Sequence, residues 1–459
     1  MVSATESLAI WTAEKTWDSV SPADQAMAVE AFIDTIGVAV AGIDEPVSTA
    51  VRNYVSSTAR SGPGRVWGTS LELAPAAAAF ANGTSAMSQE FDDRHTCTGH
   101  PSCILVPALL GIGQSEGLPG RTIVEAYAAA LGVFAAVAEL YQENLPTRGW
   151  HATSTLGVVA GAAGVAKALD MKPADIEMAI GIAVSLAAGV SANFGSQTKP
   201  LHAGWAARSA IEAALLAREG VTSAPDALYG ELGGMAAFGH VSGAEIVGTQ
   251  DDLDRLTAIA DDALSGLIRK QFPTLGSTHL AAEAALEVHD QLPTDSRIVG
   301  AHIQLSRGSQ ALSYLEDPVD PSAARHSFRF VVAVTLARGL PVPRYFDDAE
   351  LYDRDTRRLM DLLTIDEDTS GPYGAGNAKS PSQYADLSVR LEDGTEIHSH
   401  RTNPPRNVKG DAVDRKFLAC TAHGMGEGQA HDLLSRLRGL TAIGNLADLF
   451  DADKPTYTP

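Results

Sequence analysis

Apolar residues recur at three- and four-residue spacings, between Gly and Pro breaks, from the start of the chain to about residue 265. This period predicts a succession of α-helices. Ser21-Pro-Ala-Asp predicts a helix start, because serine caps helices and proline suits the first helical position. Runs such as Gly157-Val-Val-Ala-Gly-Ala-Ala-Gly are apolar on nearly every face, which is typical of helices inside a bundle. We expect further helices at residues 103–115, 122–141, 154–169 and 174–190.

From about residue 266 the pattern changes to a mixture of strands and helices. Residues 297–306 and 385–391 alternate between apolar and polar side chains, which predicts strands, and Asp393-Gly394 predicts a hairpin turn. Residues 332–339 and 349–363 are typical of helices, and a helical pattern returns at 428–437. The chain therefore divides into residues 1–265, 266–400 and 401–459, and its length favours two domains.

Composition and charge limit the possible partners. With 45% hydrophobic and 20% charged residues, the chain is typical of a folded globular protein. The formal charge of -22 should repel phosphate backbones and anionic lipid surfaces. We therefore expect neither nucleic acid nor a membrane as partner. An anionic substrate would require cationic side chains gathered locally against the sign of the whole molecule.

The cysteines and the N-terminus suggest a cytoplasmic protein. The three cysteines, Cys97, Cys103 and Cys420, form no CxxC pair, which argues against disulfides and structural zinc. We see neither a secretory signal nor an uncharged apolar run of the roughly 18 residues that a membrane span needs.

Ionisable residues gather in five segments. A loop around Glu90-Phe-Asp-Asp-Arg94-His and His100 could form a site or be a solvated surface loop. His151, at the start of an apolar helix, should resist protonation and could act as a base, or be a capping or core histidine. Lys199 and His202 lie among small and apolar residues, where a charge needs an anionic partner such as a substrate. Lys270, before Phe-Pro, could bind a carboxylate. Tyr314 and Ala324-Arg325-His326 follow the first strand.

The motifs of several well-known enzyme classes are absent from the sequence. The chain contains neither HExxH nor zinc-ligand spacing, neither a GxSxG elbow nor a recognisable cysteine nucleophile, and we expect no metal. The glycine-rich loop that begins at Gly371 neither follows a strand nor opens a helix, so we do not interpret it as a phosphate loop. Acid–base chemistry on a carboxylate-bearing small molecule remains, with histidine, lysine or tyrosine as proton carriers.

The order of these segments resembles the MmgE/PrpD family, which includes 2-methylcitrate dehydratase, cis-aconitate decarboxylase and iminodisuccinate epimerase. The resemblance covers nearly the whole chain. It implies a mainly α fold, in which a large helical-bundle domain is completed by the C-terminal segment and a smaller α+β lid domain is inserted. It also implies a homodimer and a reaction without cofactor or metal. Its landmarks are Asp34-Thr-Ile-Gly-Val, Asn82-Gly, Phe91-Asp-Asp with His100-Pro-Ser, His151 with Ser154 and Gly157, Thr198-Lys-Pro-Leu-His-Ala-Gly, Lys270-Gln-Phe-Pro and Ala324-Arg-His-Ser-Phe.

The resemblance also implies a site. By this resemblance the catalytic residues would be Glu90, His100, His151, Lys199, Lys270 and Tyr314. As substrate-binding residues we expect Asp93, Arg94, Ser102, His202 and Arg325. Three positions depart from the family pattern. Glu90 is usually Asp, Arg94 is commonly small or Thr, and Leu275 replaces a histidine of the animal decarboxylases. Asp92 and Asp93 are better suited to supporting loop and helix ends than to acid catalysis.

Our leading hypothesis is a lyase that removes a proton next to a carboxylate of a di- or tricarboxylate. Among such lyases, we rank a dehydratase of the 2-methylcitrate type first. A cis-aconitate-type decarboxylase and a dicarboxylate epimerase are alternatives. A catalytically silent binding protein with the family fold, or a metal-dependent hydrolase, would belong to a different class.

Overall fold

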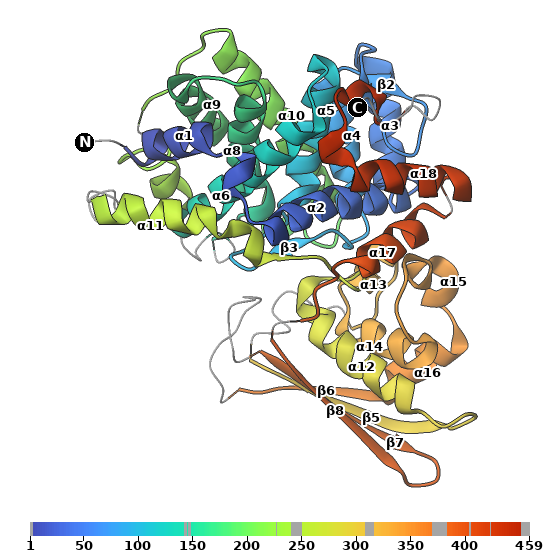
Figure 1. Ribbon diagram of the computed structural model, residues 1–459. Helices are drawn as coiled ribbons and strands as arrows, with labels where there is room; N and C mark the ends of the chain where they lie inside the picture. Colours follow the sequence, from blue (N-terminus) through green and yellow to red (C-terminus); the bar gives the residue numbers. More distant parts are fainter. Residues whose placement is uncertain are drawn as a thin grey trace. The chain divides into compact units, whose positions relative to one another are not determined.

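The computed structural model describes residues 3–141, 145, 148–225, 227–239, 250–307, 316–369, 383–403, 405–422 and 424–450. It is mainly helical, as predicted (Figure 1). The chain folds into two compact units. The helical unit comprises Met1–Ser88, Asp92–Arg269 and Val408–Pro459, and the α+β unit comprises Gln89–Phe91 and Lys270–Asn407.

The helical unit is built around α8 (Ala152–Ala168), whose residues are nearly all buried. It packs against α5 (Ser102–Glu116), α6 (Gly120–Tyr141), α9 (Pro173–Ser185) and α10 (Thr198–Arg218). Small residues permit these contacts, as the glycine pattern predicts: a Cβ on Gly164 would lie 2.6 Å from Cβ of Ala130 on α6. The other α-helices of the described part of this unit are α1 (Ala4–Glu14), α2 (Pro22–Ala41), α3 (Pro46–Thr58), α4 (Pro75–Met87), α11 (Gln250–Asp261), α17 (Asp411–Thr421) and α18 (Glu427–Arg438).

Helices α10 and α4 approach each other closely. Gly204 of α10 faces the main chain of α4, and a Cβ there would lie 2.4 Å from the carbonyl oxygen of Phe80. Only glycine fits at this distance. Consequently, the first turns of α10, which carry Lys199 and His202, are fixed against α4.

Helix α2 joins the N-terminal part of the unit to its C-terminal segment. Ser21 caps α2 by accepting a hydrogen bond from the Asp24 N–H, with Pro22 at the first helical position, as predicted. Both α17 and α18 pack against α2. Lys416 of α17 lies 2.7 Å from Asp34 of α2, and both side chains are buried. Burial raises the pKa of Asp34, and the nearby Lys416 opposes this shift.

Helix α6 is long and apolar enough to cross a membrane by length and composition alone. However, 89% of its most apolar window is buried inside the structure, as in the central helix of a bundle. Helices α2 and α3 pass the same test only when taken together, and they are bent by 93°. The apolar character of α6 is therefore satisfied by its neighbours in the helical unit.

The α+β unit contains a four-stranded sheet of order β6-β5-β7-β8. Strands β5 (Ile298–Leu305) and β6 (Leu363–Glu367) are parallel, whereas β7 (Tyr384–Leu391) is antiparallel to both β5 and β8 (Glu396–Thr402). Helix α12 (His279–Gln291) packs on β7 and β8 and on α14 (Phe328–Arg338), which packs on α16 (Arg354–Leu362). Further elements of the two units are the helix α13 (Pro321–Arg325) and the short strands β1 (Gly64–Arg65) and β2 (Glu72–Leu73).

Two expected helices differ from the structure. The helix expected at 349–363 is α15 (Asp348–Leu351) followed by α16, because Asp353 caps α16 with its carboxylate and ends the first helix. The last residue of that range, Leu363, begins β6. The helix expected at 174–190 ends at Ser185, and the non-helical segment that follows includes Gly189, whose φ is 106°. The glycine-rich loop that begins at Gly371 lies outside the described residues.

Candidate active site

His100 lies at the end of a loop that precedes α5. Its Nδ1 lies 2.8 Å from the carbonyl oxygen of Asp93 and 3.2 Å from Oδ2 of Asp92. Both neighbours are acceptors, so Nδ1 carries a proton and donates it. In the neutral ring the lone pair is then on Nε2. The side chain is 14% exposed, and its main-chain N–H donates to Thr153 of α8. Nε2 is thus the nitrogen that can take or give a proton.

Asp93 and Ser102 form a buried group behind His100. The Ser102 N–H donates to Oδ1 of Asp93, and the Ser102 hydroxyl bonds to Oδ2 of Asp93 and to the Tyr127 hydroxyl. Burial raises the pKa of Asp93 to about 7, with Asp34 and Asp92 adding to the rise. These bonds hold the loop to the start of α5, and the binding of substrate by Asp93 and Ser102 stays a prediction.

His151 and His202 form a buried pair. His151 lies at the start of α8 and His202 in the second turn of α10, and their Nδ1 atoms are 2.9 Å apart. One ring donates and the other accepts, so they cannot both be protonated at Nδ1 without losing the hydrogen bond. Burial lowers the pKa of His202, and Lys199 adds to this effect. Lys199 is itself buried and lies over the ring of Phe194, 4.9 Å from its centroid, while His151 contacts the same ring.

Arg94 is half-buried in the two-residue strand β3 (Arg94–His95), which pairs with β4 (Leu267–Ile268). The neighbouring ring of His95 bonds to Cys97 and to the carbonyl of Ala263. The loop between Asp92 and His100 is therefore anchored at β3. This pairing places the Arg94 main chain but does not test the predicted contact with substrate.

Glu90 and Lys270 belong to the α+β unit and contact each other there. Both are buried, and the Lys270 ammonium donates to the carbonyl oxygen of Glu90 at 2.9 Å and lies 3.5 Å from its Oε2. Glu90 has a φ of 54°, in the left-handed region that residues with a side chain rarely adopt. Such strain is retained where the surroundings fix the chain, often at functional sites.

His326 completes this group and was not among the predicted site residues. Its Nδ1 donates to the carbonyl of Ser322, and its Nε2 lies 3.8 Å from Oε1 of Glu90. The segment Ala324-Arg-His-Ser-Phe contains His326 directly beside the predicted Arg325. The guanidinium of Arg325 stacks over Phe346, and its carbonyl accepts from the Leu275 N–H. Tyr314 lies outside the described residues.

Comparison with known proteins identifies the family. The MmgE/PrpD N-terminal domain matches residues 6–246, and the MmgE/PrpD C-terminal domain matches residues 272–437. This chain belongs to the MmgE/PrpD family. MmgE/PrpD relatives include the cis-aconitate decarboxylases of Mus musculus and Homo sapiens, each 29% identical over 79% of this chain and 75% of the relative. The cis-aconitate decarboxylase of Aspergillus terreus is 28% identical over 66% of each chain.

The relatives support lyase chemistry for this MmgE/PrpD protein. In its helical unit, the structure brings His151, His202 and Lys199 together and ties His100 to the first turn of α8 through Thr153. In its α+β unit, Lys270 meets Glu90. Within the described parts of the chain, no three His, Cys, Asp or Glu side chains gather as metal ligands.

Proposed function

We propose that this protein is a lyase that moves a proton next to a carboxylate of a di- or tricarboxylic acid. The observation that carries this proposal is the arrangement of His100, whose Nδ1–H is held by the Asp93 carbonyl beside the Asp92 carboxylate. An imidazole held in this way exchanges protons at Nε2 alone, and the carboxylate stabilises the cation that forms when Nε2 takes a proton.

The other cationic and imidazole groups of the helical unit suit the same chemistry. Lys199 is a buried ammonium, and it can stabilise the charge that develops on a substrate carboxylate during proton transfer. The His151–His202 pair shares one proton through its Nδ1 atoms, so a change of protonation in one ring is coupled to the other ring. We assign the pair to proton transfer together with His100, and Lys199 to carboxylate binding. In the α+β unit, Lys270 is proposed as a further carboxylate-binding group.

Decarboxylation of cis-aconitate is the reaction to test first. The curated relatives named above carry that activity in their names. Loss of CO2 leaves a carbanion that must receive a proton, whereas dehydration begins by removing one. The same Nε2 serves both reactions in opposite directions. Dehydration of 2-methylcitrate, our first expectation from the sequence, is therefore the second candidate, and Glu90 in place of Asp favours a substrate that differs from that of the relatives.

The test is to incubate the purified protein separately with cis-aconitate, 2-methylcitrate and citrate, and to follow alkene absorbance and CO2 release. Release of CO2 from cis-aconitate supports the decarboxylase. A new alkene from 2-methylcitrate or citrate without CO2 supports the dehydratase. If all three acids stay unchanged, the proposed substrate class is wrong.

We further propose that the reaction needs neither a metal nor an organic cofactor. The acid, base and cationic groups described above supply the charge stabilisation that the reaction requires. Protein treated with a chelator and then desalted should keep its turnover rate. A loss of activity that added zinc or magnesium restores would contradict this proposal.

A further inference from the structure

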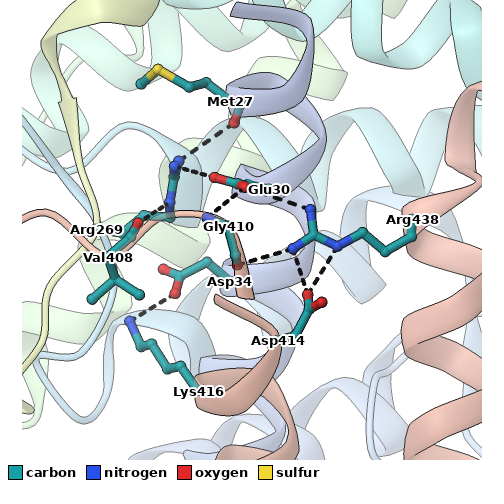
Figure 2. A network of polar contacts seen from close by, with 9 residues as sticks. All are labelled: Met27, Glu30, Asp34, Arg269, Val408, Gly410, Asp414, Lys416 and Arg438. Carbon is teal, nitrogen blue, oxygen red and sulfur yellow. Dashed lines mark hydrogen bonds and ion pairs between the residues drawn. The ribbon is translucent and has the colours of Figure 1, made fainter. Parts of the chain in front are cut away.

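A polar cluster built on the buried pair Glu30 and Arg269 occupies the points where the chain leaves and re-enters the helical unit. The chain leaves after Arg269 and returns at Val408. We name the residues Glu30, Arg269, Val408, Gly410 and Arg438 the Glu30 clamp (Figure 2). All five belong to the helical unit, so the cluster is described within one compact unit.

Arg269 is held through both its side chain and its main chain. Its side chain is fully buried, and Nη2 donates to Oε2 of Glu30 at 2.5 Å. Its Nε donates to the carbonyl of Val408 at 2.9 Å, and the Val408 N–H donates back to the carbonyl of Arg269 at 3.2 Å. A further bond joins Nη1 to the carbonyl of Met27 at 3.4 Å (Figure 2). These contacts fix the Arg269 carbonyl group, which is covalently bonded to the nitrogen of Lys270.

The second oxygen of Glu30 holds the returning segment. The Gly410 N–H donates to Oε1 at 2.9 Å, and Nη1 of Arg438 lies 3.5 Å from the same atom. Arg438 also donates to the Gly410 carbonyl and to Asp414. The Glu30 side chain is only 7% exposed. One carboxylate thus ties together the segments that precede Lys270 and follow Asn407.

We propose that Glu30 and Arg269 are positioning residues for Lys270 in the proposed lyase reaction. This inference rests on the proposed function, in which Lys270 binds a carboxylate. The planar peptide between Arg269 and Lys270 transmits the orientation of the fixed carbonyl to the Lys270 nitrogen. A mutation far from the chemistry that misplaces a reacting group by about 1 Å can lower the rate about 100-fold.

The clamp differs from an ordinary stabilising ion pair. Buried ion pairs are weak evidence for stability, because desolvation offsets much of the attraction. Here the two charged groups also bind main-chain atoms: Arg269 binds Val408 and Met27, and Glu30 binds Gly410. The charges consequently set the path of the main chain at both connections.

The test compares Glu30→Gln with a matched core variant, Val413→Ala. Glutamine keeps the size of the side chain and an acceptor for Gly410, but it removes the charge that orients Arg269. Val413 is fully buried on α17 beside the clamp, so its truncation lowers stability without removing a clamp contact. For each variant we would measure kcat and KM with cis-aconitate, at a temperature where all variants are folded, and hydrogen exchange of the Val408 and Gly410 amides.

We expect Glu30→Gln to lower kcat/KM by about 10- to 100-fold and to speed exchange at Val408, while Val413→Ala leaves both near wild type. Arg269→Lys should lower kcat/KM by a similar factor, because an ammonium cannot reproduce the two-pronged hydrogen bonding of a guanidinium. Wild-type kinetics and exchange in a folded Glu30→Gln protein would overturn the inference, as would an equal kinetic loss in Val413→Ala.

If the wild type turns over none of the acids, the proposed function fails. Amide exchange then tests whether Glu30 positions the main chain: faster exchange in Glu30→Gln supports this role, and unchanged exchange overturns it.

Discussion

His100 owes its defined proton arrangement to two oxygens, the Asp93 carbonyl and the Asp92 carboxylate. We predict that His100→Ala lowers kcat by at least about 100-fold, the lower end of what general acid–base catalysis contributes. Asp92→Asn should cost less, because the carbonyl of Asp93 still accepts from Nδ1. The exposed His302→Ala on β5 is the control, and circular dichroism would show that all variants fold. Undiminished turnover in His100→Ala would remove this residue from the mechanism.

Asp93 makes the stability of the protein depend on pH. Its pKa is about 7 in the folded protein and about 3.9 in an unfolded chain, so the folded state favours the neutral form. The stability that this preference contributes is fully present below pH 4 and is lost as the pH rises through 7. At 1.36 kcal/mol per pKa unit, the loss is at most about 4 kcal/mol.

The measurement is urea unfolding of wild type and Asp93→Asn between pH 5 and pH 8. Asparagine does not titrate, so wild type should lose stability relative to the variant as the pH rises. A difference between the two proteins that stays constant over this range would contradict the raised pKa of Asp93.

At the scale of single residues, the sequence indicates His100, His151 and Lys199 by residue type and surroundings. It could not show that the ring of His151 meets that of His202, because this contact depends on how α8 and α10 pack. His326 was passed over for the same reason, since its contact with Glu90 joins segments more than 200 residues apart. Local pattern indicates which side chains are unusual, and long-range packing decides their partners.

At the scale of elements, the approach of α10 to α4 leaves no room for a side chain at Gly204. We predict that Gly204→Ala destabilises the protein by about 1–3 kcal/mol, the usual effect of overpacking. The matched control is Gly428→Ala in α18, where a Cβ would meet nothing within 4 Å. That variant should be neutral or up to about 1 kcal/mol more stable, because alanine favours helix. Equal unfolding free energies of the two variants would show that α10 can shift.

The helices that the sequence predicted best are long apolar runs, such as α5, α6 and α8. The pattern failed where one polar side chain changes the local geometry, as Asp353 does between α15 and α16. It also missed β6, whose five residues alternate in burial but form too short a run to be recognised without their pairing with β5. Short elements depend on their partners, which a local pattern does not contain.

At the scale of the whole molecule, the helical unit is completed by residues from both ends of the chain. Truncation after Asn407 removes α17 and α18, which pack on α2, and leaves Glu30 and Asp34 without their C-terminal partners. We predict that this truncated chain does not fold, since buried charges without partners cost several kcal/mol each. Truncation after Phe450 keeps every contact described here and is the control. A cooperative thermal transition in the shorter chain, followed by circular dichroism, would contradict this prediction.

The same discontinuity affects how the protein is made. Helix α2 ends at residue 41, but α17, which covers it, begins only at residue 411. At synthesis rates of 5–20 residues per second, roughly 20 to 70 s separate the two on the ribosome. During this interval the face of α2 that α17 and α18 cover, which includes Glu30 and Asp34, lacks its partners. The nascent chain should therefore depend on chaperones until α17 and α18 emerge.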